Sequence, residues 1–256
     1  MIFMRILPGV LKELMKHVPT VLFQTVEWSS IMSEIPVISR RMLQKEGYAE
    51  LADLQKEFLK DLPLCVRHEI VNGPVLKKGD GRTILALYFR QLFSPHGVFL
   101  DLRSMHFNHE SDVLLWNPGT LWTKFSPQFR EGLIQVYDGF YLGKDDLYRE
   151  GLVKIGLLDL SWPKADQIHI MEIFSKHFGA AKSEDVEFRL ENLKGGMVSM
   201  AQFLLEKKTR ITTDFLYLGI YLVTMYGTLE ETKETLPVKE IYLSSRVQMG
   251  LTSVKS

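Results

Sequence analysis

Two histidines and a carboxylate stand close together between His106 and Glu110, in a chain of 256 residues. His106 and His109 are three residues apart. On a helix this spacing would place both imidazoles on one face, where Glu110 could complete a metal site. The common zincin pattern is absent, because it requires two histidines four apart with a glutamate between them. We therefore favour a polar loop that carries two histidines over a metal centre.

Other side chains with catalytic potential lie outside any familiar motif. The sequence has no Gly-x-Ser-x-Gly element, no Gly-x-x-x-x-Gly-Lys-[Ser/Thr] loop and no Gly-x-Gly-x-x-Gly fingerprint. Cys65 lies in an apolar stretch, which predicts a buried and inert thiol. The backbone amides of Gly79-Asp80-Gly81 could bind an anion, although a plain turn is the favoured interpretation. His169 and His177 share a predicted helix without a carboxylate in register, and we expect ordinary surface or half-buried residues there.

Composition describes an ordinary globular protein without a charge surplus. Lys plus Arg and Asp plus Glu both total 31, so the net charge is zero and binding to nucleic acid has no electrostatic support. The single cysteine excludes an internal disulfide and a multi-cysteine zinc site, and it indicates a reducing compartment. The longest apolar stretch, 215–225, is about half the length of a membrane span. It could form a surface-seeking helix or, equally well, a buried core helix.

Apolar periodicity and turn residues predict the elements that must position these side chains. Strands are expected at 2–7 and 64–71, and two further apolar pieces, 98–102 and 113–116, suggest a small hairpin or a catalytic-loop arrangement. Helices are expected at 10–18, 37–60, 83–94, 127–140, 145–155, 164–178, 185–207 and 211–226. Ser126-Pro127 is a strong helix start, because serine can cap the helix and proline fits its first position. The chain is thus predicted to be α+β, with strands confined to its first half and no clear domain boundary.

Six segments stand in an order that resembles the UbiB/AarF family of atypical kinases. That family carries, in turn, a lysine strand, a glutamate-bearing helix, a hinge strand, a helix before the catalytic loop, a metal-binding motif and a tail helix. The corresponding segments here are FMRILPGV (3–10), QKEGYAELADLQKEF (44–58), LCVRHEIVNGPVL (64–76), ALYFRQLFSPHGVFLDL (86–102), the closest match SDVLLWNPGTLWTKFSPQFREGLIQVYDGFYLGKDDLYREGLVKIGLLD (111–159), and DFLYLGIYLVTMYGTLEE (214–231). The resemblance is nearly colinear over residues 2–235 and lies in order and spacing more than in single motifs.

The resemblance implies a single kinase-like domain over residues 1–256. A reduced N-lobe and hinge strand would occupy about 1–76, and a mostly helical C-lobe about 77–256. By the same resemblance, the role would be in quinone or isoprenoid-lipid metabolism at a membrane surface. The implied partner is a lipid, a quinone precursor or a protein. The implied location is the cytoplasm, with peripheral membrane contact at most.

The catalytic parts that the resemblance implies are degenerate. Where the family has Ala-Asp-Pro-His-Pro-Gly-Asn, this chain has LDLRSMHFN, in which Asp101, His106 and Asn108 are loosely placed remnants; Asp101 and Asn108 are the vestigial catalytic candidates. Asn117-Pro118-Gly119 replaces the metal-binding Asp-Phe-Gly. A neutral amide at Asn117 removes the main electrostatic reason for magnesium to bind.

The nucleotide-binding parts are weaker still. The family's Lys-x-Gly-Gln motif and its Ala-rich nucleotide loop are missing. Arg5 or Met4 stands nearest to the position of the family's lysine, and Arg5 is the candidate; Glu46 or Glu50 would be the helix glutamate, without a lysine partner. Both acidic residues are equally well explained as solvated helix charges.

Three functions remain open. The first is a divergent and catalytically inactive kinase-like protein that binds or regulates, for which no cofactor is expected. The second is a residual ATPase or kinase that uses ATP and magnesium in a rearranged site formed by Asp101, Asn108 and Asn117. The third is a helical interaction module without a ligand.

Overall fold

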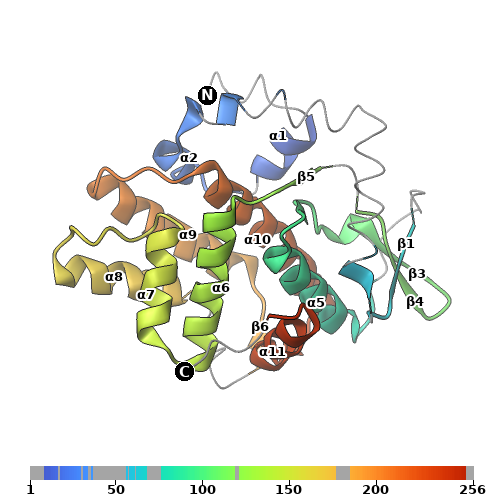
Figure 1. The fold of residues 1–256 in the computed structure, drawn as a ribbon. Coiled ribbons are helices and arrows are strands. Elements are labelled where there is room, and N and C mark those ends of the chain that lie inside the picture. The colour runs from blue at the N-terminus through green and yellow to red at the C-terminus, as the bar shows by residue number, and fades with distance from the viewer. Residues whose placement is uncertain are drawn as a thin grey trace.

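The computed structural model describes residues 9–16, 18–29, 31–33, 36, 56, 58–60, 62–67, 76–118, 121–176 and 185–251. The fold is α+β and mostly helical, as predicted (Figure 1). The predicted strand at 2–7 and almost all of the predicted helix at 37–60 lie outside the described residues. The division into a lobe at 1–76 and a lobe at 77–256 therefore stays a prediction.

Most of the predicted helices are present, but the helix predicted at 185–207 begins only at Leu190, and the helices at Leu22–Thr25 and Val238–Gln248 were not predicted. The described helices are α1 (Gly9–Met15), α2 (Leu22–Thr25), α5 (Asp80–Phe93), α6 (Pro127–Leu142), α7 (Asp145–Lys154), α8 (Lys164–Ser175), α9 (Leu190–Glu206), α10 (Thr213–Thr232) and α11 (Val238–Gln248). Helix α6 begins at the predicted cap, where the Ser126 hydroxyl accepts a hydrogen bond from the Phe129 amide. Helix α5 begins three residues earlier than expected. Its first residue is Asp80, so the glycine-rich loop is shorter than predicted.

Helix α10 is the centre of the helical body. Nearly every residue from Thr213 to Leu229 is buried, and the helix lies against α5, α9 and α1. A helix that is apolar on all sides is stable only when it is enclosed by protein or lipid. The 215–225 stretch is thus a buried core helix and not a surface-seeking one. Among the described residues, no helix is long and apolar enough to cross a membrane.

Among the described residues, three short sheets accompany the helices. Strands β1 (Leu64–Val66), β4 (Val113–Trp116) and β3 (Phe107–Glu110) form one sheet in the order β1-β4-β3, with β1 parallel and β3 antiparallel to β4. Strands β2 (Val98–Phe99) and β5 (Trp122–Thr123) pair antiparallel. The prediction that the pieces 98–102 and 113–116 form a hairpin with each other is therefore wrong. The piece at 113–116 pairs with the polar stretch 107–110, because the turn at Ser111-Asp112 lets the chain fold back at once.

Two further predictions are corrected. Strands are not confined to the first half, since β6 (Val186–Glu187) pairs with β7 (Thr235–Leu236). This ladder is too short to leave a period-2 pattern in the sequence. Cys65 is exposed and not buried. It lies on the edge strand β1, where side chains alternate between faces, so its neighbour Leu64 enters the core and the thiol faces outward.

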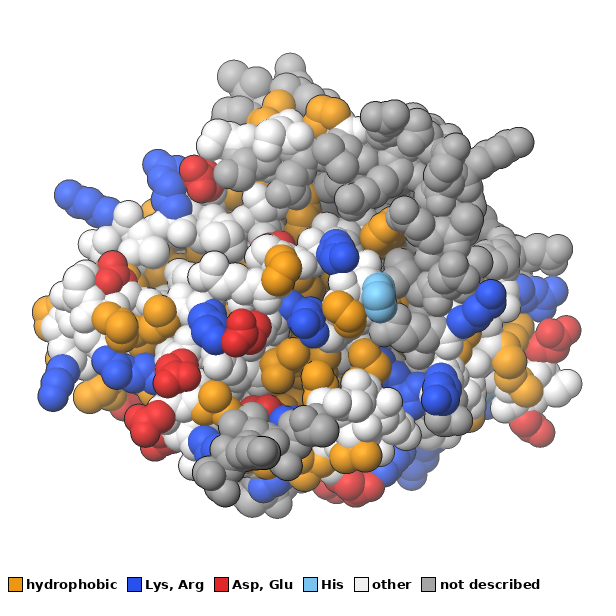
Figure 2. Space-filling model, in the orientation of Figure 1, with side chains coloured by type: hydrophobic (Ala, Val, Ile, Leu, Met, Phe, Trp, Pro, Cys, Tyr) orange, Lys and Arg blue, Asp and Glu red, His pale blue; other side chains and the backbone are white. Residues whose placement is uncertain are grey.

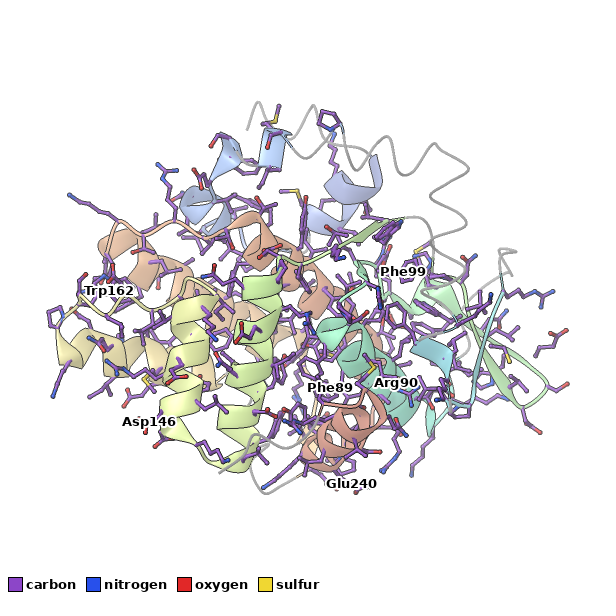
Figure 3. The ribbon with its side chains drawn as sticks, viewed as in Figure 1. Phe89, Arg90, Phe99, Asp146, Trp162 and Glu240 are labelled. Atoms are coloured by element: carbon purple, nitrogen blue, oxygen red, sulfur yellow. The ribbon has the colours of Figure 1, made fainter. Side chains whose placement is uncertain are left out.

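A buried arginine connects distant parts of this body. Arg90 on α5 is 2% exposed, and its guanidinium donates to the carbonyls of Phe58 and Lys60 and to the Gln248 side chain of α11. Figure 3 shows Arg90 and Phe89 on α5 beside α11, which carries Glu240. The surface is mixed in charge: on the face seen in Figure 2, Lys and Arg side chains are interspersed with Asp and Glu.

Candidate functional site

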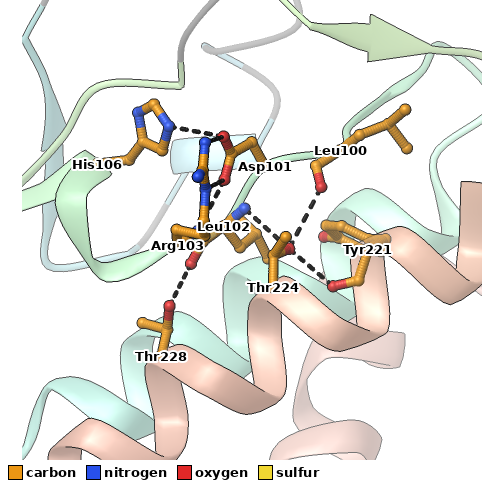
Figure 4. A network of polar contacts seen from close by, with 8 residues as sticks. All are labelled: Leu100, Asp101, Leu102, Arg103, His106, Tyr221, Thr224 and Thr228. Carbon is orange, nitrogen blue, oxygen red and sulfur yellow. Dashed lines mark hydrogen bonds and ion pairs between the residues drawn. The ribbon is translucent and has the colours of Figure 1, made fainter. Parts of the chain in front are cut away.

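The segment 100–106 is fastened to the central helix α10 by side-chain hydroxyls. The Thr224 hydroxyl oxygen accepts a hydrogen bond from the Leu102 amide at 3.1 Å and lies 3.2 Å from the Leu100 carbonyl oxygen (Figure 4). One turn later, the Thr228 hydroxyl donates to the Leu102 carbonyl at 2.6 Å. Both threonines are buried. The backbone on either side of Asp101 is therefore held in place by the buried helix α10.

Asp101 forms the centre of a closed cluster. Arg103 binds its carboxylate with two parallel hydrogen bonds, from Nε to Oδ1 at 2.9 Å and from Nη2 to Oδ2 at 2.6 Å. The Nε2 atom of His106 lies 3.0 Å from the same Oδ2. The Asp101 side chain is only 4% exposed, so these two groups and the Arg103 amide enclose it.

The cluster favours the ionised carboxylate. Burial by itself would raise the pKa of Asp101, but hydrogen bonds and charge from His106 and Arg103 outweigh it and hold the pKa well below its usual range. A carboxylate held this way is a poor general base, because it has little tendency to accept a proton at neutral pH.

The two asparagine candidates lie on the neighbouring hairpin. Asn108 is half-buried on β3, and its side-chain oxygen accepts a hydrogen bond from the His109 amide at 2.7 Å. Asn117 directly follows β4, and its backbone N–H donates a hydrogen bond to the His106 carbonyl at 2.7 Å. The structure thus brings Asn117 beside His106, and through His106 near Asp101. Arg5 and Glu46 lie outside the described residues.

The two histidines of the suggested metal site serve different aspartates. His106 contacts Asp101, whereas the Nε2 atom of His109 lies 2.8 Å from Oδ2 of Asp80, at the start of α5. Within the described part of the chain, no group of three or more His, Cys, Asp or Glu side chains could hold a metal ion. His106 ends the short 3₁₀ turn Ser104–His106 and His109 lies on β3, so the two rings do not share the face of one helix that a three-residue spacing would require.

The glycine-rich turn binds the protein's own carboxylates. Oδ2 of Asp80 accepts a hydrogen bond from the Lys77 amide at 2.6 Å, and the Gly81 amide donates to Oε1 of Glu234 at 3.0 Å. The turn prediction is confirmed for Gly79, whereas Asp80 and Gly81 are the first residues of α5. His169 is exposed with its ring against Phe203, at 5.5 Å between centroids, and His177 lies outside the described residues.

The residue that the sequence analysis missed is Arg103. Its signal was present, because a side chain two positions after an aspartate in a tight loop can reach back to it. Protein kinases place an asparagine five residues after the catalytic-loop aspartate, as a magnesium ligand. Here the fifth residue after Asp101 is His106, which binds the carboxylate directly.

These residues do not fit a magnesium–nucleotide complex. Magnesium prefers carboxylate oxygens in open octahedral geometry. The Asp101 carboxylate is enclosed by cationic or hydrogen-bonding groups, the Asn108 oxygen is engaged by a backbone amide, and Asn117 offers only a neutral side chain. In comparisons with known proteins, no family model and no curated protein matches this chain.

Proposed function

We propose that this protein is a divergent kinase-like protein of the UbiB/AarF type that has lost phosphoryl transfer and acts by binding. The observation that carries the proposal is the Asp101 carboxylate, 4% exposed and bound by Arg103 and His106. Phosphoryl transfer needs a carboxylate that can accept a hydroxyl proton, and others that hold magnesium. Here the best-placed aspartate already has its hydrogen-bonding capacity used by the protein itself.

The arrangement of the surrounding elements supports the kinase-like part of the proposal. A hinge-like strand, β1, lies beside β4. Along the chain, the hairpin β3–β4 stands between the Asp101 loop and Asn117. The order along the chain matches the order of a hinge strand, a helix, a catalytic loop and a metal motif. A role in quinone or isoprenoid-lipid metabolism, in the cytoplasm or peripherally at a membrane, is proposed from the resemblance alone.

Thermal unfolding with nucleotide tests the proposal. We expect the midpoint to stay unchanged when ATP is added with millimolar Mg²⁺ or Mn²⁺, because a ligand raises stability only if it binds the folded state. Binding at a hundredfold excess over Kd would add about 2.7 kcal/mol. A metal-dependent rise that Asn117→Ala abolishes, and that the remote surface change Asn192→Ala leaves intact, would overturn the proposal in favour of a residual ATPase.

A further inference from the structure

A groove adjoins the Asp101 cluster on the side of α10. It encloses about 330 Å³ between the short 3₁₀ turn at Ser104–His106, the start of α9 and the second half of α10. Its apolar wall includes Met105, which is 60% exposed, together with Leu190 and Val223. A volume of this size is at the lower end of ligand sites and suits one or two side chains of a partner.

The charge on the rim of this groove is unbalanced. Glu230 and Glu231 are both exposed there, and the described part of the lining contains one cation, Arg103. The Arg103 guanidinium is already neutralised by its two hydrogen bonds to Asp101. Arg189 lies close enough to Glu230 to interact with it electrostatically, but its direct partner is the Glu187 carboxylate. Among the described residues that line it, the groove therefore presents two negative charges and no unpaired positive one.

Gly227 opens the groove down to the backbone of α10. A glycine inside a helix costs about 1 kcal/mol relative to alanine. Close packing does not explain Gly227, because a Cβ placed there would find no atom within 4 Å. The missing side chain leaves room above an otherwise buried helix, next to the two glutamates.

The groove and the Asp101 loop share two residues. Thr224 and Thr228 line the groove and also hold the backbone of residues 100–102. Ser104, at the other wall, donates a hydrogen bond to Glu231 at 2.8 Å. An occupant of the groove would thus touch the residues that position the loop.

We propose that this groove binds a protein partner through a basic side chain that stands next to an aliphatic one in an exposed peptide segment. The aliphatic group would lie against Met105, Leu190 and Val223, and the basic group would reach Glu230 and Glu231. Arginine and lysine fit best, because their long apolar stems can pass over Gly227 while the charge meets the carboxylates. The inference rests on the proposed function as a binding protein, and it specifies the kind of partner that would bind beside the Asp101 loop.

A positional-scanning library of biotinylated nonapeptides, probed with the purified full chain, tests this inference. We expect selection of Arg or Lys beside Leu, Ile or Met. We expect the signal to fall at least tenfold for Glu230→Gln/Glu231→Gln, and to fall similarly for Gly227→Leu, which fills the groove. The matched control is Glu172→Gln, an exposed glutamate on α8. Circular dichroism melts verify that each variant is folded, which is expected of Gly227→Leu because its side chain enters open space.

Three results would overturn the inference. One is a library without preference for basic residues. Another is a preference that persists in the folded Gly227→Leu and double glutamine variants. The third is full competition by spermine with no contribution from aliphatic residues, which would point to a polyamine. None of these results depends on nucleotide, so peptide binding by the groove can be disproved while the proposed function stands. Conversely, a metal-dependent response to ATP can overturn the proposed function while peptide binding persists.

Discussion

Two aspartate–arginine ion pairs in this protein have similar geometry but differ in the sequence separation of their two residues. Asp101 and Arg103 are two residues apart in one loop. Asp138 on α6 and Arg246 on α11 are 108 residues apart, joined from Nε to Oδ1 at 2.6 Å and from Nη2 to Oδ2 at 2.8 Å. In each pair a third side chain contacts the carboxylate, His106 in the first and the Tyr242 hydroxyl in the second.

The difference lies in what each pair encloses. Asp138 is completely buried, and Arg246 also donates to the Leu251 carbonyl at 2.6 Å, so this pair connects α6, α11 and the residues after α11. The Asp101 pair keeps a quarter of the Arg103 side chain exposed and is anchored next to a groove. The same chemistry thus fastens two helices together in one place and closes a candidate site in the other.

The largest expected effect comes from breaking the long-range pair. Arg246→Met should lower the free energy of unfolding by about 3–5 kcal/mol, because it leaves the Asp138 carboxylate buried without its cation. Urea denaturation measures the loss. The double variant Asp138→Leu/Arg246→Met should lose less than the single variant, since no uncompensated charge remains. A single variant as stable as the parent chain would show that this pair does not hold the helices together.

A smaller and pH-dependent effect is expected at the local pair. Asp101→Asn should cost about 1–3 kcal/mol at neutral pH, because charge-assisted hydrogen bonds are replaced by weaker ones. The pKa of Asp101 is lower in the folded than in the unfolded chain. Its contribution is therefore complete above the unfolded value of about 4 and is lost as the pH falls below it. Urea denaturation from pH 7 to pH 3 should show the parent and variant converging in acid. A constant gap between the two would contradict the ionised cluster.

The smallest effect on the free energy of unfolding is expected for the exposed ion pair of Arg82 and Glu240. Both side chains are more than half exposed, at 53% and 63%. Glu240→Gln should change the free energy of unfolding by about 0–1 kcal/mol, because water screens the pair and competes for its hydrogen bonds. The same denaturation assay provides the value. A loss comparable to that of Arg246→Met would mean that burial is not what separates the pairs.

Much of the helical architecture could be predicted from local patterns. The Ser126-Pro127 start of α6 depends on hydrogen bonds within one turn, and the apolar stretch 215–225 predicted the core of α10. Helix boundaries were less certain. Helix α5 begins at Asp80, three residues before the first residue expected from apolar periodicity, and the Asp80 carboxylate accepts a hydrogen bond from the backbone amide of Lys77 in the preceding turn.

Only part of the candidate site could be predicted from the sequence. Asp101, Asn108 and Asn117 could be named from their order along the chain, and the structure places Asn117 beside His106. The contact of Arg103 with Asp101 has a local signal, because the two residues are two positions apart, but the sequence does not show that His106 turns toward the same carboxylate or that the group is buried. The groove beside it combines residues from three separate segments and leaves no local trace.

By itself, the sequence determined most of the longer helices, although not α11, and it showed where serine and proline start α6 and which stretch is too apolar to face water. These preferences act between residues a few positions apart, so they can be recognised without knowing the tertiary contacts that stabilise the helices. Only the tertiary structure decided that Cys65 faces outward, that His106 and His109 bind different aspartates, and that Asp138 meets Arg246. Such contacts join groups whose distance is undefined until the core closes, because burial and partner choice depend on the whole fold.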